Sequence, residues 1–268
     1  MVAMLAEILT KAGKNFGLGG NLDGDNFKPA LDLLAEDEKD LYLLELSSFQ
    51  LETTQNLGAA VGTILNLSAD HMDRYEGIDD YRRAKQRIFN GCKQVVINRD
   101  DKESSPLVES DAAVWDFGFG RAGLNGLGVL EEGGDLYLAY QLEKIVSVNE
   151  LKVFGQHNIS NVLAAVALSM AIGIDMNAIK AAITEFSGLP HRCQWVANID
   201  GVDFYNDSKG TNVGATVAAV EGLGEHISGH IVLIAGGIAK GANFTALVPA
   251  MNKCCLLYTS PSPRDVEE

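Results

Sequence analysis

Short apolar runs alternate with helical patterns along most of this chain, from Lys14 to about Phe186. The candidate strands are Asn15–Leu18, Leu41–Leu46, Ala60–Leu67, Gln94–Asn98 and Ala112–Phe117, and the candidate helices are Pro29–Ala35, Ile78–Asn90, Ile159–Ala171 and Met176–Glu185. Strands that alternate with helices in this way typically form a parallel sheet covered by helices. The sequence therefore predicts an α/β fold with a mostly parallel sheet flanked by helices.

Glycines and prolines divide the chain into segments. Between Gly126 and Val153, glycines separate short alternating runs, which predict antiparallel hairpins. Gly188-Leu189-Pro190 is the strongest break, so we predict one domain over 1–187 and the start of a second over 188–253. The second opens with a hairpin around Asp200-Gly201 and continues through a helix and the strand Ile231–Ala235. This order is typical of a Rossmann-like α/β domain.

The two ends of the chain differ from the rest. The chain opens inside a helical pattern with no N-cap before it. Residues 254–268 show no period and hold two closely spaced prolines. From these features we expect the chain to be a fragment, with 254–268 a non-native tail that takes no part in the fold.

The charge balance limits the partners of this chain. It has 36 acidic and 21 basic residues, a formal net charge of −15. This opposes a nucleic-acid or anionic-membrane surface, because phosphates need clustered lysine and arginine. The longest nearly apolar stretch, Val162–Ile174, is shorter than the ~20 residues of a membrane span. The 4 cysteines fit no zinc spacing, so we expect a reduced, cytoplasmic protein.

A carboxylate and two hydroxyls follow the apolar run that starts at Leu41. Glu45, Ser47 and Ser48 stand where a buried parallel strand ends, and open α/β sheets bind ligands at that edge. An N-cap for the next helix explains either serine equally well. It accounts less well for Glu45, whose carboxylate would stand at the end of an apolar run, and a hard cation such as Mg²⁺ is a suitable partner for it.

A second polar cluster follows the next apolar run and contains Asp70, His71 and Asp73. Such a cluster is usually a solvated turn. Because the carboxyl ends of parallel strands lie at the same edge of a sheet, His71 is also a candidate neighbour of a metal or phosphate there.

The predicted helix Ile78–Asn90 carries Arg82, Arg83, Lys85 and Arg87. We interpret the three arginines as a solvated basic face. Lys85 lies on the apolar side of the helix, beside Tyr81, so it is a candidate for pointing inward; the pattern alone leaves this open.

Three further stretches place polar groups at loops or helix starts. Asn158 and Asn161 are three residues apart at the start of a long apolar helix, where they could be caps or could contact a base or ribose. Arg192 follows the domain break, and Asp207 and Lys209 lie in a later loop. Turn chemistry explains the aspartate but not the added lysine.

The hexapeptide Gly118–Gly123 has the glycine pattern of a dinucleotide site. That pattern needs a helix to begin within it. More glycines follow here, so we predict that no helix starts and reject this site.

In their order along the chain, these motifs resemble those of the Mur ligases, ATP-dependent amide-forming enzymes of bacterial peptidoglycan synthesis. The resemblance runs from about Val2 to Lys253. The stretches Glu45–Glu52 and Asp70–Tyr75 are similar to those of the family members that add D-glutamate.

The resemblance implies a reaction. ATP would phosphorylate the alanyl carboxylate of UDP-N-acetylmuramoyl-L-alanine, and the amine of D-glutamate would attack the resulting acyl phosphate. Phosphoryl transfer of this kind depends on positioned cations, and the implied cofactors are ATP and Mg²⁺. The resemblance also leads us to expect a monomer.

The resemblance implies roles for particular residues. Mg²⁺ ligands would be Glu45, His71 and Lys85, the last as a carbamate. Contacts to the muramoyl substrate or metal shell would be Asn21, Ser47 and Gln50; nucleotide contacts would be Asn158, Asn161, Arg192, Asp207 and Lys209; and acceptor contacts would be Thr211 and Lys240.

The implied carbamate requires a neutral amine. Holding a lysine of pKa ~10.4 neutral at pH 7 costs about 4–5 kcal/mol unless burial reduces that cost. A role of this kind therefore favours an inward-facing Lys85 over a solvated one.

The chain also departs from the family pattern. It holds no Gly-x-x-Gly-Lys-Ser/Thr phosphate loop, and Ile238-Ala239 stands where some relatives carry Asp-Gly. We also expect the N-terminal UDP-binding domain and most of the C-terminal domain to be missing, so we predict an inactive fragment. Two alternatives stay open: another amide ligase, such as a folylpolyglutamate synthetase, and a non-catalytic nucleotide-binding module.

Overall fold

The computed structural model describes residues 1–22, 28–107, 111–153, 155–224, 227, 229–236 and 243–259. The chain divides into two compact units. The N-terminal unit comprises Met1–Lys152 with Ser160–Phe186, and the C-terminal unit comprises Val153–Ile159 with Ser187–Glu268. The main segment of the C-terminal unit begins beside Gly188. Residues 153–159, which the sequence pattern places in the first domain, belong with the second unit.

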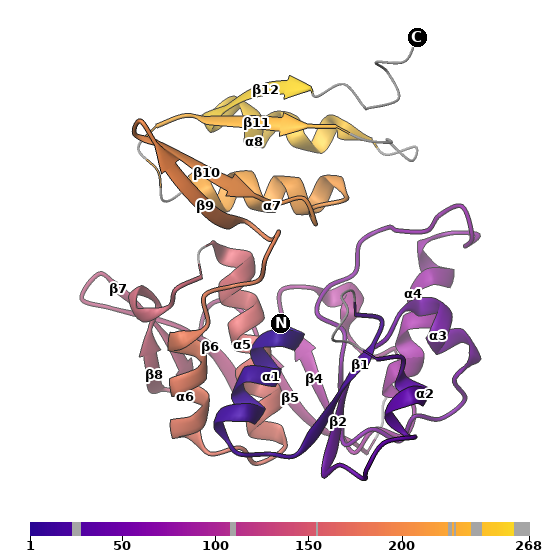
Figure 1. Ribbon diagram of the computed structural model, residues 1–268. Helices are drawn as coiled ribbons and strands as arrows, with labels where there is room; N and C mark the ends of the chain where they lie inside the picture. The colour runs from indigo at the N-terminus through magenta and orange to yellow at the C-terminus, as the bar shows by residue number, and fades with distance from the viewer. Residues whose placement is uncertain are drawn as a thin grey trace. The chain divides into compact units, whose positions relative to one another are not determined.

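The N-terminal unit is built around parallel strands (Figure 1). Strands β1 (Phe16–Gly20) and β2 (Leu41–Glu45) form a parallel pair. A six-stranded sheet has the order β3 (Val61–Thr63), β4 (Gln94–Asn98), β5 (Ala113–Phe117), β6 (Gly126–Glu132), β7 (Asp135–Tyr140) and β8 (Glu143–Ser147). Neighbours from β3 to β6 are parallel, whereas β6, β7 and β8 are antiparallel. The predicted fold class and the predicted hairpins are therefore confirmed.

Helices lie around these strands. In Figure 1, α1 (Val2–Lys11), α5 (Gln156–Ala171) and α6 (Met176–Glu185) gather on one side of the unit, and α2 (Ala30–Leu33), α3 (Ser48–Thr53) and α4 (Ile78–Gln86) on the other. The predicted helix over 78–90 is α-helical only to Gln86 and continues as a 3₁₀ turn, Arg87–Phe89. Further 3₁₀ turns are Lys102–Ser104 and Val148–Glu150. Helix α5 begins three residues earlier than predicted, just after Gly155 with its φ of 86°.

The core of this unit lies between the sheet and helix α5. Residues 162–167 of α5 are fully buried, as are Val96 of β4, Phe117 of β5, Leu127 of β6 and Leu138 of β7. A helix that is apolar on all sides is typically buried, which explains the unbroken apolar stretch seen in the sequence. The described residues include no helix that is both long and apolar enough to cross a membrane.

The C-terminal unit begins with the predicted hairpin. Strands β9 (Gln194–Ile199) and β10 (Val202–Asn206) are antiparallel, and Asp200 and Gly201 between them have φ of 52° and 82°. Two successive positive φ values are typical of a type I′ turn. Helix α7 (Val213–Gly224), strand β11 (Ile231–Ala235), the 3₁₀ turn Phe244–Ala246 and helix α8 (Leu247–Cys254) follow.

Strand β12 (Cys255–Thr259) pairs in parallel with β11. The segment expected to stay outside the fold is thus described up to Thr259, and its backbone there belongs to a sheet. Residues 260–268 lie outside the described part of the chain.

The glycine pattern at 118–123 lies in the connection between β5 and β6, and the next regular element is a strand. No helix begins within the pattern, which confirms its rejection as a dinucleotide site.

Candidate active site

Parallel pairing brings the ends of β1 and β2 together. Gly20 is the register partner of Glu45, and the Asn21 N–H donates to the Glu45 carbonyl oxygen at 2.6 Å. Both Asn21 and Glu45 are exposed. Two of the predicted site residues therefore share one sheet edge, as expected for ligand-binding strand ends.

Ser47 and Gln50 form a capping box at the start of α3. The Ser47 N–H donates to Gln50 Oε1 at 2.8 Å, and the Gln50 N–H donates to Ser47 Oγ at 3.3 Å. These contacts are those of a helix N-cap. The structure thus supports the capping interpretation, and any substrate contact by these side chains would have to coexist with the cap.

His71 lies in an exposed turn after β3, with a left-handed φ of 55°. Its N–H donates to Asp70 Oδ1 at 2.9 Å, and its ring lies 4.8 Å from the ring of Phe49 on α3. The motif therefore folds as a polar turn, and its imidazole packs against an aromatic ring rather than standing free in solvent.

Lys85 is half-buried on α4, and its Nζ lies 5.1 Å from the centre of the Tyr81 ring. Tyr81 itself is buried, in a small cluster with Tyr75 and Ala84. The expectation that Lys85 lies on the apolar side of its helix, beside Tyr81, is confirmed.

The three arginines of this helix do not form the solvated face expected from the sequence. Arg82 is 18% exposed and donates to Glu103 Oε2 at 2.6 Å, and Arg87 donates from Nη2 to the Thr54 carbonyl oxygen at 2.8 Å. Only Arg83, at 69% exposure, fits the prediction. Arg82 and Arg87 donate to acceptors that are distant along the chain. Helical periodicity does not predict such contacts.

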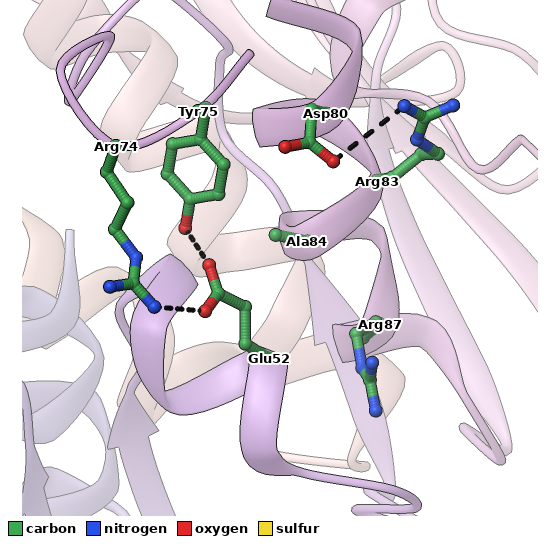
Figure 2. Close-up of a pocket in the computed structure, with 7 residues that line it drawn as sticks. All are labelled: Glu52, Arg74, Tyr75, Asp80, Arg83, Ala84 and Arg87. Carbon is green, nitrogen blue, oxygen red and sulfur yellow. Dashed lines mark hydrogen bonds and ion pairs between the residues drawn. The ribbon is translucent and has the colours of Figure 1, made fainter. Parts of the chain in front are cut away.

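A cavity of about 450 Å³ lies between α3 and α4. It is lined by Glu52, Arg74, Tyr75, Asp80, Arg83, Ala84 and Arg87 (Figure 2). None of the predicted site residues lines it. Glu52 accepts from Arg74 Nη2 and from the Tyr75 hydroxyl, each at 2.5 Å. The pKa of Glu52 is lowered mainly by the hydrogen bond from Arg74 and secondly by the hydrogen bond from Tyr75. This carboxylate is therefore ionised at neutral pH.

The metal ligands implied by the family resemblance are a carboxylate, an imidazole and a carbamate. Among the described residues, no three His, Cys, Asp or Glu side chains converge closely enough to hold a metal ion. Mg²⁺ usually retains several waters and uses only one or two protein carboxylates together with substrate phosphates. Exposed Glu45 at a strand end fits that demand, and a carbamate on Lys85 would add a second oxygen ligand.

In the C-terminal unit, the loop that carries Arg192 is held by residues 206–209. His191 and Cys193 have positive φ of 63° and 47°. The Cys193 N–H donates to Asp207 Oδ1 at 2.9 Å, and the Lys209 N–H donates to the His191 carbonyl oxygen at 3.1 Å. Left-handed non-glycine residues are costly and persist where surrounding contacts enforce them, often at functional loops. The structure therefore brings Arg192, Asp207 and Lys209 onto two loops that are hydrogen-bonded to each other.

The other predicted residues are placed as follows. Asn158 and Asn161 are half-buried in the first turns of α5, and Thr211 is exposed, with its N–H donating to the Lys209 carbonyl oxygen at 2.9 Å. Lys240 lies outside the described residues.

Two titratable groups next to Asp207 are desolvated. Burial lowers the pKa of His157, and the Asp207 carboxylate partly offsets this decrease. Burial and the same carboxylate raise the pKa of the Cys193 thiol to about 11. His157 and Cys193 therefore favour their neutral forms at neutral pH.

We expect Cys193 to resist alkylation in the folded chain. With a pKa of about 11, only about one Cys193 thiol in a thousand is ionised at pH 8. Iodoacetamide labelling followed by peptide mass spectrometry should show slow modification at pH 8, and much faster modification in urea. The folded state keeps a proton that the unfolded chain releases, so the free energy of unfolding should fall between about pH 9 and about pH 11. Equal labelling rates in folded and urea-unfolded chains would contradict this assignment.

Sequence reasoning gave no role to Glu52, Arg74 or His157. Glu52 and Arg74 stand in the two motifs that were singled out, yet their contact joins residues separated by 22 positions. No spacing rule links such residues, so only their shared presence beside candidate site residues could have suggested a role.

The chain was compared with known protein families and structures. Residues 1–169 match the Mur ligase middle domain, and residues 191–268 match the Mur ligase glutamate ligase domain. The chain belongs to the Mur ligase family. This confirms the resemblance drawn from the motifs.

Within the family, the chain is similar to D-glutamate ligases. The chain is 52% identical over 255 residues to the UDP-N-acetylmuramoylalanine–D-glutamate ligase of Pseudomonas savastanoi pv. phaseolicola, and 49% identical to that of Pseudomonas aeruginosa. These matches cover 95% of this chain and 56% of each relative. The chain thus spans little more than half the length of these relatives.

Solved structures agree on the fold. A pseudomurein peptide ligase type C from Methanothermus fervidus matches with a TM-score of 0.71 and 17% identity, over 96% of this chain and 61% of that one. MurF ligase from Thermotoga maritima, solved in complex with ADP, matches with a TM-score of 0.70 and 15% identity, over 99% of this chain and 65% of that one. At these identities the likeness supports the fold alone.

Proposed function

We propose that this chain is part of an ATP-dependent ligase that adds D-glutamate to UDP-N-acetylmuramoyl-L-alanine. The main support is the 52% identity to a D-glutamate ligase across 95% of the chain. The sheet edge that holds Asn21 and Glu45 is a suitable place for the substrate and metal ion. A cytoplasmic location and a monomeric state belong to the same proposal.

In this proposal the reacting groups meet around a Mg²⁺ ion and ATP. Glu45, His71 and a carbamate on Lys85 would hold the metal ion, and a bound ion there would supply positive charge for phosphoryl transfer. Asn21, Ser47 and Gln50 would contact the muramoyl substrate, whose alanyl carboxylate is phosphorylated.

The remaining residues would handle the nucleotide and the acceptor. Asn158 and Asn161 would hold the adenosine part. Arg192 and Lys209 would place positive charge near the phosphates, with Asp207 fixing the loop of Arg192 through the Cys193 N–H. Thr211 and Lys240 would contact D-glutamate as its amine attacks the acyl phosphate.

The test uses a hybrid enzyme in which this chain replaces its matching segment in the Pseudomonas savastanoi ligase. We expect phosphate release from Mg²⁺-ATP only when both UDP-N-acetylmuramoyl-L-alanine and D-glutamate are present. The chain alone should release phosphate only at background rate, because it holds no Gly-x-x-Gly-Lys-Ser/Thr loop to bind the ATP phosphates.

The unmodified Pseudomonas savastanoi ligase serves as the positive control. A folded hybrid that prefers another acceptor, such as a folyl substrate with L-glutamate, would replace this proposal with a different ligase. A hybrid that binds ATP but forms no product with any acceptor would favour a non-catalytic nucleotide-binding module.

A further inference from the structure

The turn that carries His71 has a strained backbone, which contacts with other elements must stabilise. His71 is in the left-handed region with φ of 55°, and its carbonyl oxygen accepts from the Arg74 N–H at 2.9 Å and the Tyr75 N–H at 3.3 Å. The backbone of a non-glycine residue is strained in this region. Contacts elsewhere must therefore favour this conformation over the relaxed alternatives.

Helix α3 supplies those contacts through Phe49 and Glu52, which are three residues apart and so lie on one face of the helix. Glu52 binds Arg74 and Tyr75, as Figure 2 shows. The Arg74 guanidinium lies 4.8 Å from the centre of the Phe49 ring, and the Tyr75 ring is stacked 6.3 Å from it. We call Phe49, Glu52, Arg74 and Tyr75 the Glu52 clamp.

The clamp combines an ion pair at the surface with a buried tyrosine. An exposed ion pair alone contributes little to stability, but Tyr75 is just 7% exposed and its hydroxyl donates to Glu52. Loss of the carboxylate would remove one acceptor from this buried hydroxyl, and such losses are destabilising. Burial, and to a smaller extent the hydrogen bond to Glu52, raise the pKa of Tyr75. Its hydroxyl therefore remains protonated and able to donate at neutral pH.

The clamp contacts His71 directly and is linked to Lys85 through Tyr81. On one side, Phe49 packs against the His71 ring at 4.8 Å. On the other, the Tyr75 ring lies 5.2 Å from Tyr81, whose ring is 5.1 Å from Lys85 Nζ. A chain of aromatic contacts therefore joins His71 to Lys85, and Glu52 accepts a hydrogen bond from Tyr75 near its centre.

We propose that Glu52 is a positioning residue which, through Arg74, Tyr75 and Phe49, fixes the place and orientation of the His71 imidazole. The metal-binding consequence rests on the proposed function, whereas the positioning itself does not. Glu52 does not touch the substrate in this proposal; it acts by holding the turn that presents His71.

The first test is nuclear magnetic resonance of the 268-residue chain without metal ion or nucleotide. The Phe49 ring should shift the His71 ring-proton resonances away from those of a free histidine, and Glu52→Gln should return them toward free values. Glu103→Gln is the matched control, because it removes the charge of a carboxylate 2.6 Å from an arginine of the neighbouring helix without touching the clamp. It should leave the His71 resonances in place.

A second variant separates charge from stacking. Arg74→Lys keeps a cation for Glu52 but removes the planar group over Phe49, and we expect it to move the His71 resonances as well. Circular dichroism would verify that each variant is folded. Unchanged His71 resonances in folded Glu52→Gln and Arg74→Lys chains would overturn the proposal.

The metal-binding consequence has its own measurement. Mn²⁺, a paramagnetic substitute for Mg²⁺, should broaden the His71 resonances of the wild-type chain. Glu52→Gln should raise the Mn²⁺ concentration needed for half-broadening about tenfold or more, as is typical when a residue that orients a metal ligand is lost. No broadening in the wild-type chain would count against His71 as a ligand and leave the positioning result standing. An unaltered Mn²⁺ requirement in Glu52→Gln would contradict the positioning role.

Discussion

Lys85→Ala in the hybrid enzyme should lower ligase activity about 10²-fold or more, since it removes an oxygen ligand and with it charge stabilisation of the transferring phosphoryl group. Lys85 is half-buried with its Nζ beside the Tyr81 ring, a position compatible with the proposed role. The measurement is the steady-state rate of phosphate release at saturating ATP and substrates. Added formate or acetate should restore part of the activity of the variant, because a small carboxylate can occupy the place of the carbamate.

Lys144→Ala provides a matched control. Lys144 Nζ also lies over a tyrosine ring, 4.0 Å from the centre of Tyr137, but on the β7–β8 hairpin and with no proposed role in the reaction. Its loss should leave the rate within about twofold, as for most substitutions away from a site. A Lys85→Ala hybrid with the wild-type rate would refute the assignment of Lys85 as a carbamate ligand.

Gly20→Ala should destabilise the N-terminal unit by about 3 kcal/mol or more. Gly20 ends β1 with φ of +98°, and a Cβ there would overlap the carbonyl oxygen of Glu45, its register partner. Backbone atoms would have to move, so the strand ends that hold Asn21 and Glu45 would separate. The free energy of unfolding is measured by urea titration with circular dichroism detection.

Gly134→Ala separates backbone strain from steric overlap. Gly134 has a similar φ of +90°, in the turn between β6 and β7, but an added Cβ would meet no atom within 4 Å. It should cost only about 1 kcal/mol, the strain of a left-handed alanine. If both variants lose the same stability, overlap with Glu45 is not the cause.

Local patterns predicted much of the fold. Gln94–Asn98 and Met176–Glu185 are a strand and a helix with the predicted bounds, and the turn at Asp200-Gly201 forms as expected. These elements follow from apolar periodicity and turn chemistry, which act over a few residues. The predicted strand Ala60–Leu67 is shorter, Val61–Thr63, because its register with β4 covers only three residue pairs.

The candidate site was only partly predictable. Ser47 and Gln50 have the sequence signature of a capping box, and the structure shows that box. The sequence pattern placed Arg82 and Arg87 on a solvated face, whereas they donate to Glu103 and Thr54. Helical periodicity cannot predict a contact with an acceptor 21 or 33 positions away along the chain.

The sequence by itself determined the α/β class, the strand end that carries Glu45, and the family to which the chain belongs, since each depends on residue order alone. Only the tertiary structure decided that Glu52 holds Arg74 and Tyr75 and that Phe49 packs against His71. Side chains from separate elements meet only when the sheet and its helices bring those elements together. The contacts that orient a functional group are therefore a property of the folded chain.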